Sequence, residues 1–281
     1  MIPRSLLTPA DVRSLLDRHG IRPSRALGQN FVADPNTVRR IARLAGVGAG
    51  DRVVEIGPGI GSLTLALLET GAAVTAVELD RHLLPVLDET VVPGGAVVIH
   101  ADATTLDWAA TLGHEGGWVL VANLPYNVAT SLVLDVLEDA PMVERLLVMV
   151  QREVGERLAA GPGTKIYGAV SVKVAWFATA RVVARVPSTV FVPQPKVESV
   201  LVELARHPSP PADPGPGGRE RLFRMVDAGF ATRRKMLRNT LAGLVADEAF
   251  SATGVEPTER AEQLGLDAWA KLAAWSSPPP S

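Results

Sequence analysis

The chain has 281 residues, of which 47% are hydrophobic, with a formal net charge of −2 at pH 7 and no cysteine. This length and composition allow a large buried core and more than one domain. The absence of cysteine excludes disulfides, thiolate zinc sites and a cysteine nucleophile. The nearly neutral charge offers no global basic field for nucleic acid, although a local basic face would serve.

The first 16 residues, MIPRSLLTPADVRSLL, carry Asp11 and Arg13 within their apolar stretch. A signal peptide would need an unbroken apolar core there. No run in the chain approaches the roughly 18 apolar residues of a membrane span. We therefore expect a soluble, cytoplasmic and monomeric protein without a membrane partner.

Thr8-Pro9 and Asp34-Pro35 are typical helix starts, and the segment RPSRALGQNFVAD has no clean period and predicts a loop. From Asp51 onward, short apolar runs alternate with helical patterns. Strands are predicted at 52–57, 73–79, 96–100, 118–124 and 145–151, and helices at 62–69 and 81–89. Apolar strands that alternate with helices are typical of a parallel sheet covered on both faces.

Residues 167–180 predict a helix followed by a strand. Residues 180–186 and 197–205 predict two more strands, a late antiparallel addition to the sheet. The Pro- and Gly-rich segment 207–218 predicts a linker, and only helical patterns follow it, first at 219–230 and 232–245. The sequence therefore predicts an α/β domain over 1–207 and a small helical domain over 208–281.

Three glycines, Gly57, Gly59 and Gly61, directly follow the strand 52–57 and begin a helix. Glycine permits positive φ and a close approach of the backbone to a ligand. A dinucleotide fingerprint would need glycine where the chain has Ser62, and the Gly-Lys-Ser/Thr ending of a phosphate loop is missing. The loop favours a nucleoside-like ligand without a pyrophosphate; a plain strand-to-helix turn is the alternative.

Two acids stand at the ends of the next two predicted strands: Glu78 and Asp102. Ligands of open α/β sheets bind at the carboxyl ends of the strands. There Glu78 can accept from ribose hydroxyls and Asp102 from the amino group of adenine. Either acid alone would more often be a helix cap or a loop residue. Together with the glycine turn, they predict S-adenosylmethionine as the cofactor.

Asn123, Leu124, Pro125 and Tyr126 end the fourth predicted strand. An adenine N6 is a poor nucleophile because its lone pair is delocalised. The Asn123 side-chain oxygen and the Leu124 carbonyl can accept its two hydrogens, Pro125 can fix the turn, and Tyr126 can stack on a flipped base. We predict methyl transfer driven by positioning and local dipoles. A simple Asn turn with Tyr126 in packing is the alternative.

Six segments follow one another in order: ALGQNFVAD, VVEIGPGIG, VELD, ADA, NLPY and FVPQPKVES. They resemble the motifs of the ribosomal RNA adenine N6-dimethyltransferases, and GFATRRKMLRNTL resembles the bacterial small-subunit members. The resemblance implies a Rossmann-like, S-adenosylmethionine-dependent methyltransferase domain with a helical RNA-binding domain. It implies dimethylation of two adjacent adenosines in a hairpin loop of small-subunit rRNA, in an assembling 30S particle.

The resemblance also implies roles for individual residues. The expected donor-binding residues are Gln29, Asn30, the Val32 backbone, Glu55, Gly57, Gly59, Gly61, Glu78, Leu79, Asp102, Ala103 and Asn123. The expected catalytic residues are Asn123, Leu124, Pro125, Tyr126 and Phe191. Phe191 would stack on the target base opposite Tyr126; ordinary core packing is its alternative role.

The second domain carries a basic stretch with Arg233, Arg234, Lys235 and Arg238. A helix there would turn Met236, Leu237 and Leu241 inward and present the basic side chains to RNA phosphates; a solvated helix is the alternative. The five histidines lack ligand spacing, so we expect no metal. Two other functions stay open: a large-subunit rRNA methyltransferase of the macrolide-resistance type, and a non-enzymatic assembly or transcription factor.

Overall fold

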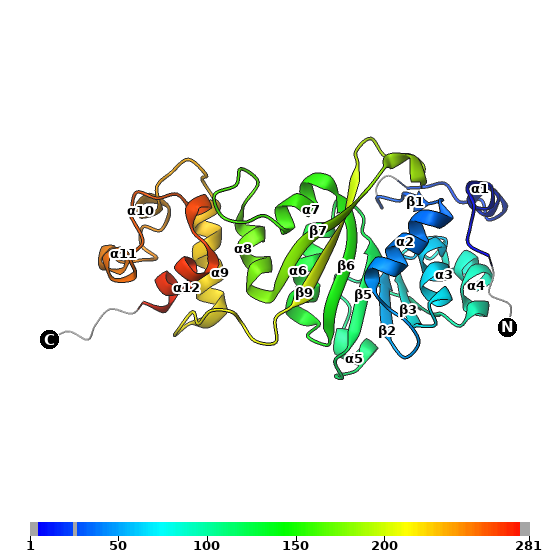
Figure 1. Cartoon of the computed structure of the whole chain (residues 1–281), viewed down its shortest axis with the longest axis horizontal. Coiled ribbons are helices and arrows are strands. Elements are labelled where there is room, and N and C mark those ends of the chain that lie inside the picture. Colours follow the sequence, from blue (N-terminus) through cyan, green and yellow to red (C-terminus); the bar gives the residue numbers. More distant parts are fainter. Residues whose placement is uncertain (1–4, 25–26, 276–281) are drawn as a thin grey trace. The chain divides into compact units, whose positions relative to one another are not determined.

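The computed structural model describes residues 5–24 and 27–275. The chain divides into two units (Figure 1). Unit 1 comprises Met1–Gly155 and Arg181–Arg206, and unit 2 comprises Glu156–Ala180 and His207–Ser281. The sequence placed all of 1–207 in the first domain, so the structure differs in assigning 156–180 to the unit of the carboxyl-terminal helices.

The α/β part of the chain contains most of the secondary structure. Its helices are α1 (Pro9–Arg18), α2 (Pro35–Ala45), α3 (Ser62–Glu69), α4 (Leu84–Thr90), η1 (Val92–Gly94), α5 (Trp108–Leu112), α6 (Ala129–Asp139), α7 (Arg152–Leu158) and η2 (Ser188–Val190). The strands are β1 (Phe31–Val32), β2 (Arg52–Ile56), β3 (Ala73–Glu78), β4 (Val97–His100), β5 (Trp118–Asn123), β6 (Val143–Gln151), β7 (Ala178–Val186), β8 (Phe191–Val192) and β9 (Ser199–Arg206).

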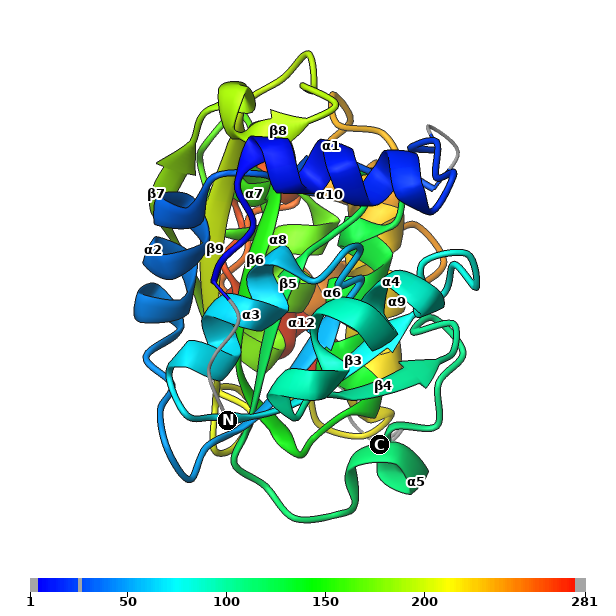
Figure 2. The same ribbon diagram turned by 90° about the vertical axis from the view of Figure 1, so that its right-hand side faces the viewer.

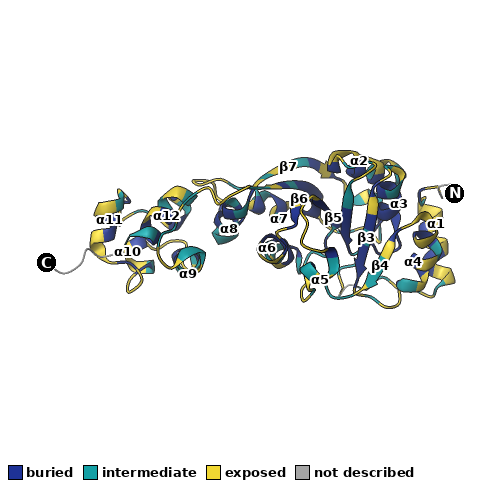
Figure 3. Ribbon diagram, turned by 90° about the horizontal axis from the view of Figure 1, so that it is seen from below, coloured by how far each residue is buried: buried dark blue, intermediate teal, exposed yellow. Residues whose placement is uncertain are grey.

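Seven of these strands form one sheet in the order β4-β3-β2-β5-β6-β9-β7. The strands β4, β3, β2, β5 and β6 run parallel, and β9 pairs antiparallel with β6. The five predicted strands between 52 and 151 and the late antiparallel addition are therefore confirmed. In Figure 3 most of β5 and β6 is coloured as buried, whereas α1 and α2 show exposed residues on one side.

The helices α1 and α2 begin where the sequence predicts. The hydroxyl of Thr8 accepts from the Asp11 N–H, and the Asp11 carboxylate accepts from the Thr8 N–H. The Asp34 carboxylate accepts from the N–H of Thr37 at 2.8 Å. Side-chain acceptors of this kind satisfy helix N–H groups that have no partner within the helix.

A two-stranded antiparallel ribbon, β1 with β8, joins the amino-terminal segment to the rest of unit 1; Figure 2 shows β8 beside α1. Phe31 pairs with Val192, and Val32 with Phe191. Phe31 belongs to a buried cluster with residues of α1 and α4, such as Leu15. The ribbon thereby anchors the segment that contains Gln29 and Asn30, which is important for the site described below.

Unit 2 is built from helices around its own core. They are α8 (Ala169–Phe177), α9 (Gly218–Phe230), α10 (Leu237–Thr240), α11 (Asp247–Thr253), η3 (Ala261–Gln263) and α12 (Leu266–Ala274). Tyr167 and Trp176 are buried in one cluster with Leu222 and Trp269, and the Tyr167 hydroxyl donates to the Leu264 carbonyl at 2.9 Å. This packing explains why 156–180 groups with the later helices.

The prediction of one long helix over 232–245 is wrong. Residues 231–235 form turns, and only Leu237–Thr240 are helical. The Leu237 N–H donates to the Glu259 carbonyl at 2.8 Å and the Arg238 N–H to the Pro257 carbonyl at 3.1 Å. These tertiary partners satisfy amides that a longer helix would use, so the local helical pattern is overridden.

Within the described ranges, no helix has both the length and the apolar character that crossing a bilayer requires.

Candidate functional site

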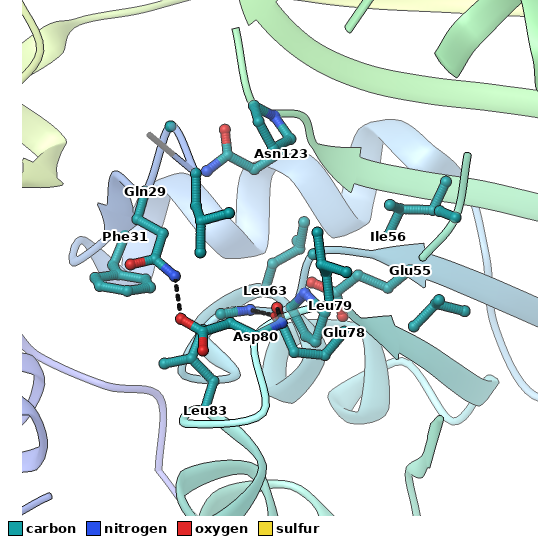
Figure 4. Close-up of a pocket in the computed structure, with 18 of the residues that line it drawn as sticks. Gln29, Phe31, Glu55, Ile56, Leu63, Glu78, Leu79, Asp80, Leu83 and Asn123 are labelled. Atoms are coloured by element: carbon teal, nitrogen blue, oxygen red, sulfur yellow. Dashed lines mark hydrogen bonds between the residues drawn. The ribbon is translucent and has the colours of Figure 1, made fainter. Parts of the chain in front are cut away.

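A cavity of about 250 Å³ opens at the carboxyl ends of the parallel strands in unit 1 (Figure 4). In the sheet, β2 lies between β3 and β5, so the chain order reverses on either side of β2. Ligands of open α/β sheets bind at this type of reversal. The lining comes from residues 27–32, from the glycine turn after β2, and from the ends of β3, β4 and β5.

The glycine turn has the conformation that the sequence predicts. Gly57 and Gly59 have φ values of 67° and 61°, which favour glycine over other residues. A Cβ on Gly59 would lie 2.8 Å from a ring carbon of Phe31. Gly61 does not line the cavity; a Cβ there would collide with Val91, so this glycine allows close packing next to α4 instead.

Glu78 ties the turn to the end of β3. Its Oε2 accepts from the Gly59 N–H at 3.1 Å and its Oε1 from the Asp80 N–H at 2.8 Å. Burial raises the pKa of Glu78, and the N–H donors at Asp80 and Gly59 counteract this shift. Because each carboxylate oxygen can accept a second hydrogen bond, Glu78 can hold the turn and still accept from a ribose.

The amino-terminal segment lies along the cavity and is fastened by Gln29. Its Oε1 accepts from the Ser24 N–H at 2.8 Å. Its Nε2 donates to Asp80 Oδ2, also at 2.8 Å (Figure 4). The sequence analysis missed Asp80, although VELD presents it two residues after Glu78. This aspartate also accepts from the His82 N–H at 3.0 Å and so begins the turn toward α4.

Asn123 stands at the end of β5 and lines the same cavity as Gly57 and Gly59. Its Nδ2 donates to the backbone carbonyl of Asn30 at 3.0 Å. With the amide nitrogen engaged in this way, Oδ1 is the atom that the side chain can offer to an incoming amine. The anchoring carbonyl belongs to the amino-terminal segment, which sequence reasoning had connected only with the methyl donor.

The remaining predicted donor residues also line the cavity. Asp102 follows β4, and its Oδ1 accepts from the N–H and the hydroxyl of Thr104 at 2.9 and 2.7 Å. Leu79 lies at the cavity with half of its side chain exposed, while Ala103 is buried. An apolar surface beside a carboxylate suits a purine ring with an amino group.

Three of the predicted catalytic residues lie outside the cavity lining. Leu124 is buried, and Tyr126 places its hydroxyl 3.1 Å from Ser199 Oγ. Phe191 is 3% exposed and belongs to the main core cluster. This burial agrees with the packing role that the sequence left as the alternative for Phe191. Pro125 does line the cavity. The roles of all these residues at a target base stay predictions.

Glu55 is the most deeply buried acid of the site. It is 1% exposed, it lines the cavity, and its Oε2 has no hydrogen-bond partner among the described residues. The same holds for the buried hydroxyls of Ser62 and Thr64. Burial raises the pKa of Glu55 to about 8, the nearby Thr64 hydroxyl opposes this shift, and the Glu78 carboxylate adds to it. At neutral pH this carboxyl is therefore mainly protonated.

The four basic residues predicted to bind RNA are all exposed in unit 2. Arg233 is partly engaged, because its guanidinium pairs with Glu262 at 2.9 Å and donates to the Lys165 carbonyl. Met236, which was expected to pack inward, is instead 37% exposed, whereas Leu237 is buried. Among residues 5–24 and 27–275, no group of three or more His, Asp or Glu side chains is arranged to hold a metal ion.

The fold is that of the S-adenosylmethionine-dependent methyltransferases, which confirms the predicted fold class. Residues 21–277 match the family described as ribosomal RNA adenine dimethylase. The chain belongs to this family, as its motifs predict.

Similar proteins include two named ribosomal RNA small subunit methyltransferase A. The protein from Leifsonia xyli subsp. xyli is 49% identical, over 96% of this chain and 98% of its own length. The protein from Kineococcus radiotolerans is 50% identical, over 96% of this chain and 91% of its own length.

Two crystal structures are also similar. The 23S rRNA methyltransferase ErmE has a TM-score of 0.66 at 25% identity, covering 87% of this chain and 98% of its own. A dimethyladenosine transferase from Plasmodium falciparum has a TM-score of 0.69 at 22% sequence identity. The match covers 86% of this chain and 95% of that chain and shows that the two share a fold.

The raised pKa of Glu55 predicts how stability depends on pH. Between the ordinary carboxyl pKa and about 8, the unfolded chain has lost this proton and the folded protein keeps it. Wild-type stability therefore falls with rising pH relative to Glu55→Gln, by roughly 3–4 kcal/mol between pH 5 and pH 8. Urea denaturation across this range measures the difference.

The exposed Glu69→Gln change serves as the control, because Glu69 pairs with Arg39 at the surface. Its difference from the wild type should stay nearly constant over the same range. A constant difference for Glu55→Gln as well would show that the buried carboxyl keeps an ordinary pKa.

Proposed function

We propose that this protein transfers methyl groups from S-adenosylmethionine to N6 of two adjacent adenosines in a hairpin loop of small-subunit rRNA. The relatives at 49–50% identity are named for small-subunit rRNA methylation. The observation that carries the proposal is the Asn123 amide, which lines the cavity with its nitrogen bound to Asn30. We further propose that the protein acts as a monomer on an assembling 30S particle in the cytoplasm.

The cavity has the chemistry that the methyl donor requires. Bound S-adenosylmethionine would supply a methyl group on a positively charged sulfur. A Cβ on Gly57 would meet only open space, and without a side chain there the backbone is accessible to the ligand. Glu78 would accept from the ribose hydroxyls, and Asp102 from the amino group of adenine. Gln29 and Asn30 would close over the methionine part.

The target amine would be activated by hydrogen bonds instead of a strong base. Asn123 Oδ1 would accept one N6 hydrogen and the Leu124 carbonyl the other, which favours a pyramidal nitrogen with an available lone pair. Pro125 restricts the backbone that presents this carbonyl. Tyr126 would stack on the flipped base, with its hydroxyl held at Ser199. Fixed dipoles of this type stabilise the charge that develops in the transition state.

A large-subunit rRNA target is the second candidate, because the 23S rRNA methyltransferase ErmE has the same fold at 25% identity. The higher identity to small-subunit enzymes favours the first. The test incubates the protein with labelled donor and either unmethylated 30S particles or unmethylated large-subunit RNA. We expect two dimethylated adenosines in the small-subunit rRNA alone. Label only in the large-subunit RNA would overturn the proposal.

The role of Asn123 predicts a separation of binding from turnover. Asn123→Ala removes the acceptor for the target amine, so turnover should fall at least about a hundredfold. The dissociation constant of S-adenosylmethionine, measured by calorimetry, should change far less than turnover, because Glu78 and Asp102 remain although the Asn30 segment loses one anchor. Turnover close to the wild-type rate would exclude Asn123 from the chemistry.

The basic residues of unit 2 predict a salt-dependent contact with RNA. The double change Arg234→Ala/Lys235→Ala should weaken RNA binding and reduce the slope of log K against log salt by about one to two. The matched control is Arg224→Ala/Lys271→Ala, which removes two exposed charges from α9 and α12. A salt slope equal to that of the wild type would place Arg234 and Lys235 outside the interface.

A further inference from the structure

The ionisable side chains of the described residues that line the cavity are all acidic. Four carboxyl groups line it: those of Glu55, Glu78, Asp80 and Asp102. Among the described lining residues there is no Lys, Arg or His side chain. Such an excess of acids among the described lining residues attracts a cation and gives a neutral molecule no such advantage. The methyl donor carries a net positive charge through its sulfonium, whereas the product S-adenosylhomocysteine is neutral overall.

Three of these acids already accept hydrogen bonds from other groups of the protein. Glu78 accepts from two backbone N–H groups, Asp80 accepts from Gln29, and Asp102 accepts from Thr104. Glu55 differs, because it is almost fully buried in β2 and its Oε2 has no backbone N–H or charged partner in the described part of the chain. The neighbouring Thr64 hydroxyl lowers its pKa, but burial outweighs this effect. Glu55 is therefore the acid whose charge depends most on what enters the cavity.

The surroundings of Glu55 keep its proton in place when the cavity holds no cation. Its strand neighbours are Ala76 on β3 and Val121 on β5, which bring no charge. The Glu78 carboxylate at the end of β3 disfavours ionisation of Glu55, and Asp80 and Asp102 line the same cavity. Burial and like charge both disfavour the carboxylate. A positive ligand reverses the second effect, and at low dielectric such an interaction acts across a cavity of this size.

We propose that Glu55 lets the protein distinguish the charged methyl donor from the neutral product by means of one proton. The carboxyl releases its proton to the solvent when S-adenosylmethionine binds and retains it when S-adenosylhomocysteine binds. After methyl transfer the positive charge leaves the sulfur, and the buried carboxylate takes up a proton from the solvent. The product thereby loses its electrostatic attraction and exchanges for new donor, which each further methylation requires.

Isothermal titration calorimetry tests this inference without RNA, so its outcome is independent of the proposed substrate. Each ligand is titrated near pH 7.5 in buffers of different ionisation enthalpy. We expect proton release with S-adenosylmethionine to exceed that with S-adenosylhomocysteine. The preference for the donor should grow with pH, and a tenfold preference corresponds to a downward shift of about one unit in the Glu55 pKa.

Glu55→Gln, the neutral isostere of the protonated acid, is the decisive variant. The α-amino groups of the ligands titrate near the same pH, so the difference between wild type and Glu55→Gln isolates the carboxyl. We expect this variant to bind S-adenosylhomocysteine like the wild type and to lose the Glu55 part of the donor preference. Asp102→Asn is the matched control: it should weaken both ligands alike and keep the proton release.

A second measurement uses the wild-type protein alone, in case Glu55→Gln does not fold. Difference infrared spectra should show loss of a protonated-carboxyl carbonyl band on addition of S-adenosylmethionine and no loss with S-adenosylhomocysteine. Equal proton release for both ligands in the wild type, or an unchanged band with the donor, would overturn the inference. So would a Glu55→Gln variant with the full pH-dependent preference of the wild type.

Discussion

The Glu78 carboxylate is the interaction on which the rest of the site depends. It accepts from the Gly59 and Asp80 N–H groups, and Asp80 in turn holds Gln29. From the segment of Gln29, the Asn30 carbonyl reaches Asn123 at the end of β5. One series of hydrogen bonds thus connects the turn that receives the donor with the amide that would receive the target base. Loss of Glu78 would disturb both halves at once.

This arrangement requires acids in a largely enclosed place, where a carboxylate is unfavourable unless it is bound. Backbone N–H groups compensate Glu78, whereas Glu55 has only the nearby Thr64 hydroxyl, and burial raises its pKa to about 8. A cationic ligand would offset the remaining repulsion between the carboxyl groups of the cavity. Donor binding and the charge balance of the cavity are therefore coupled, because the positively charged sulfonium offsets the negative charge of the carboxylates.

Strand periodicity and glycine spacing were sufficient to predict the sheet and the carboxyl-end cavity, because both follow from local patterns. The bond from Gln29 to Asp80 spans 51 residues and has no local signature. The pairing of Phe191 with Val32 in the ribbon and its burial in the main core cluster also have no local signature. The helix predicted near Leu237 fails for a similar reason, since distant carbonyls take its amides. In these cases contacts between residues far apart in the sequence determine the structure, and the local pattern does not.

Dimethylation of one nitrogen places a specific demand on Asn123. A first methylation leaves the amine with a single hydrogen, so one of the two proposed acceptors must lose its partner. The Asn123 amide cannot turn over easily, because its nitrogen is held by the Asn30 carbonyl at 3.0 Å. Its oxygen therefore keeps one position in both rounds and can retain the last N–H. The Leu124 carbonyl, by contrast, would face the methyl group already added. The anchored amide thus suits a reaction that is repeated on one atom.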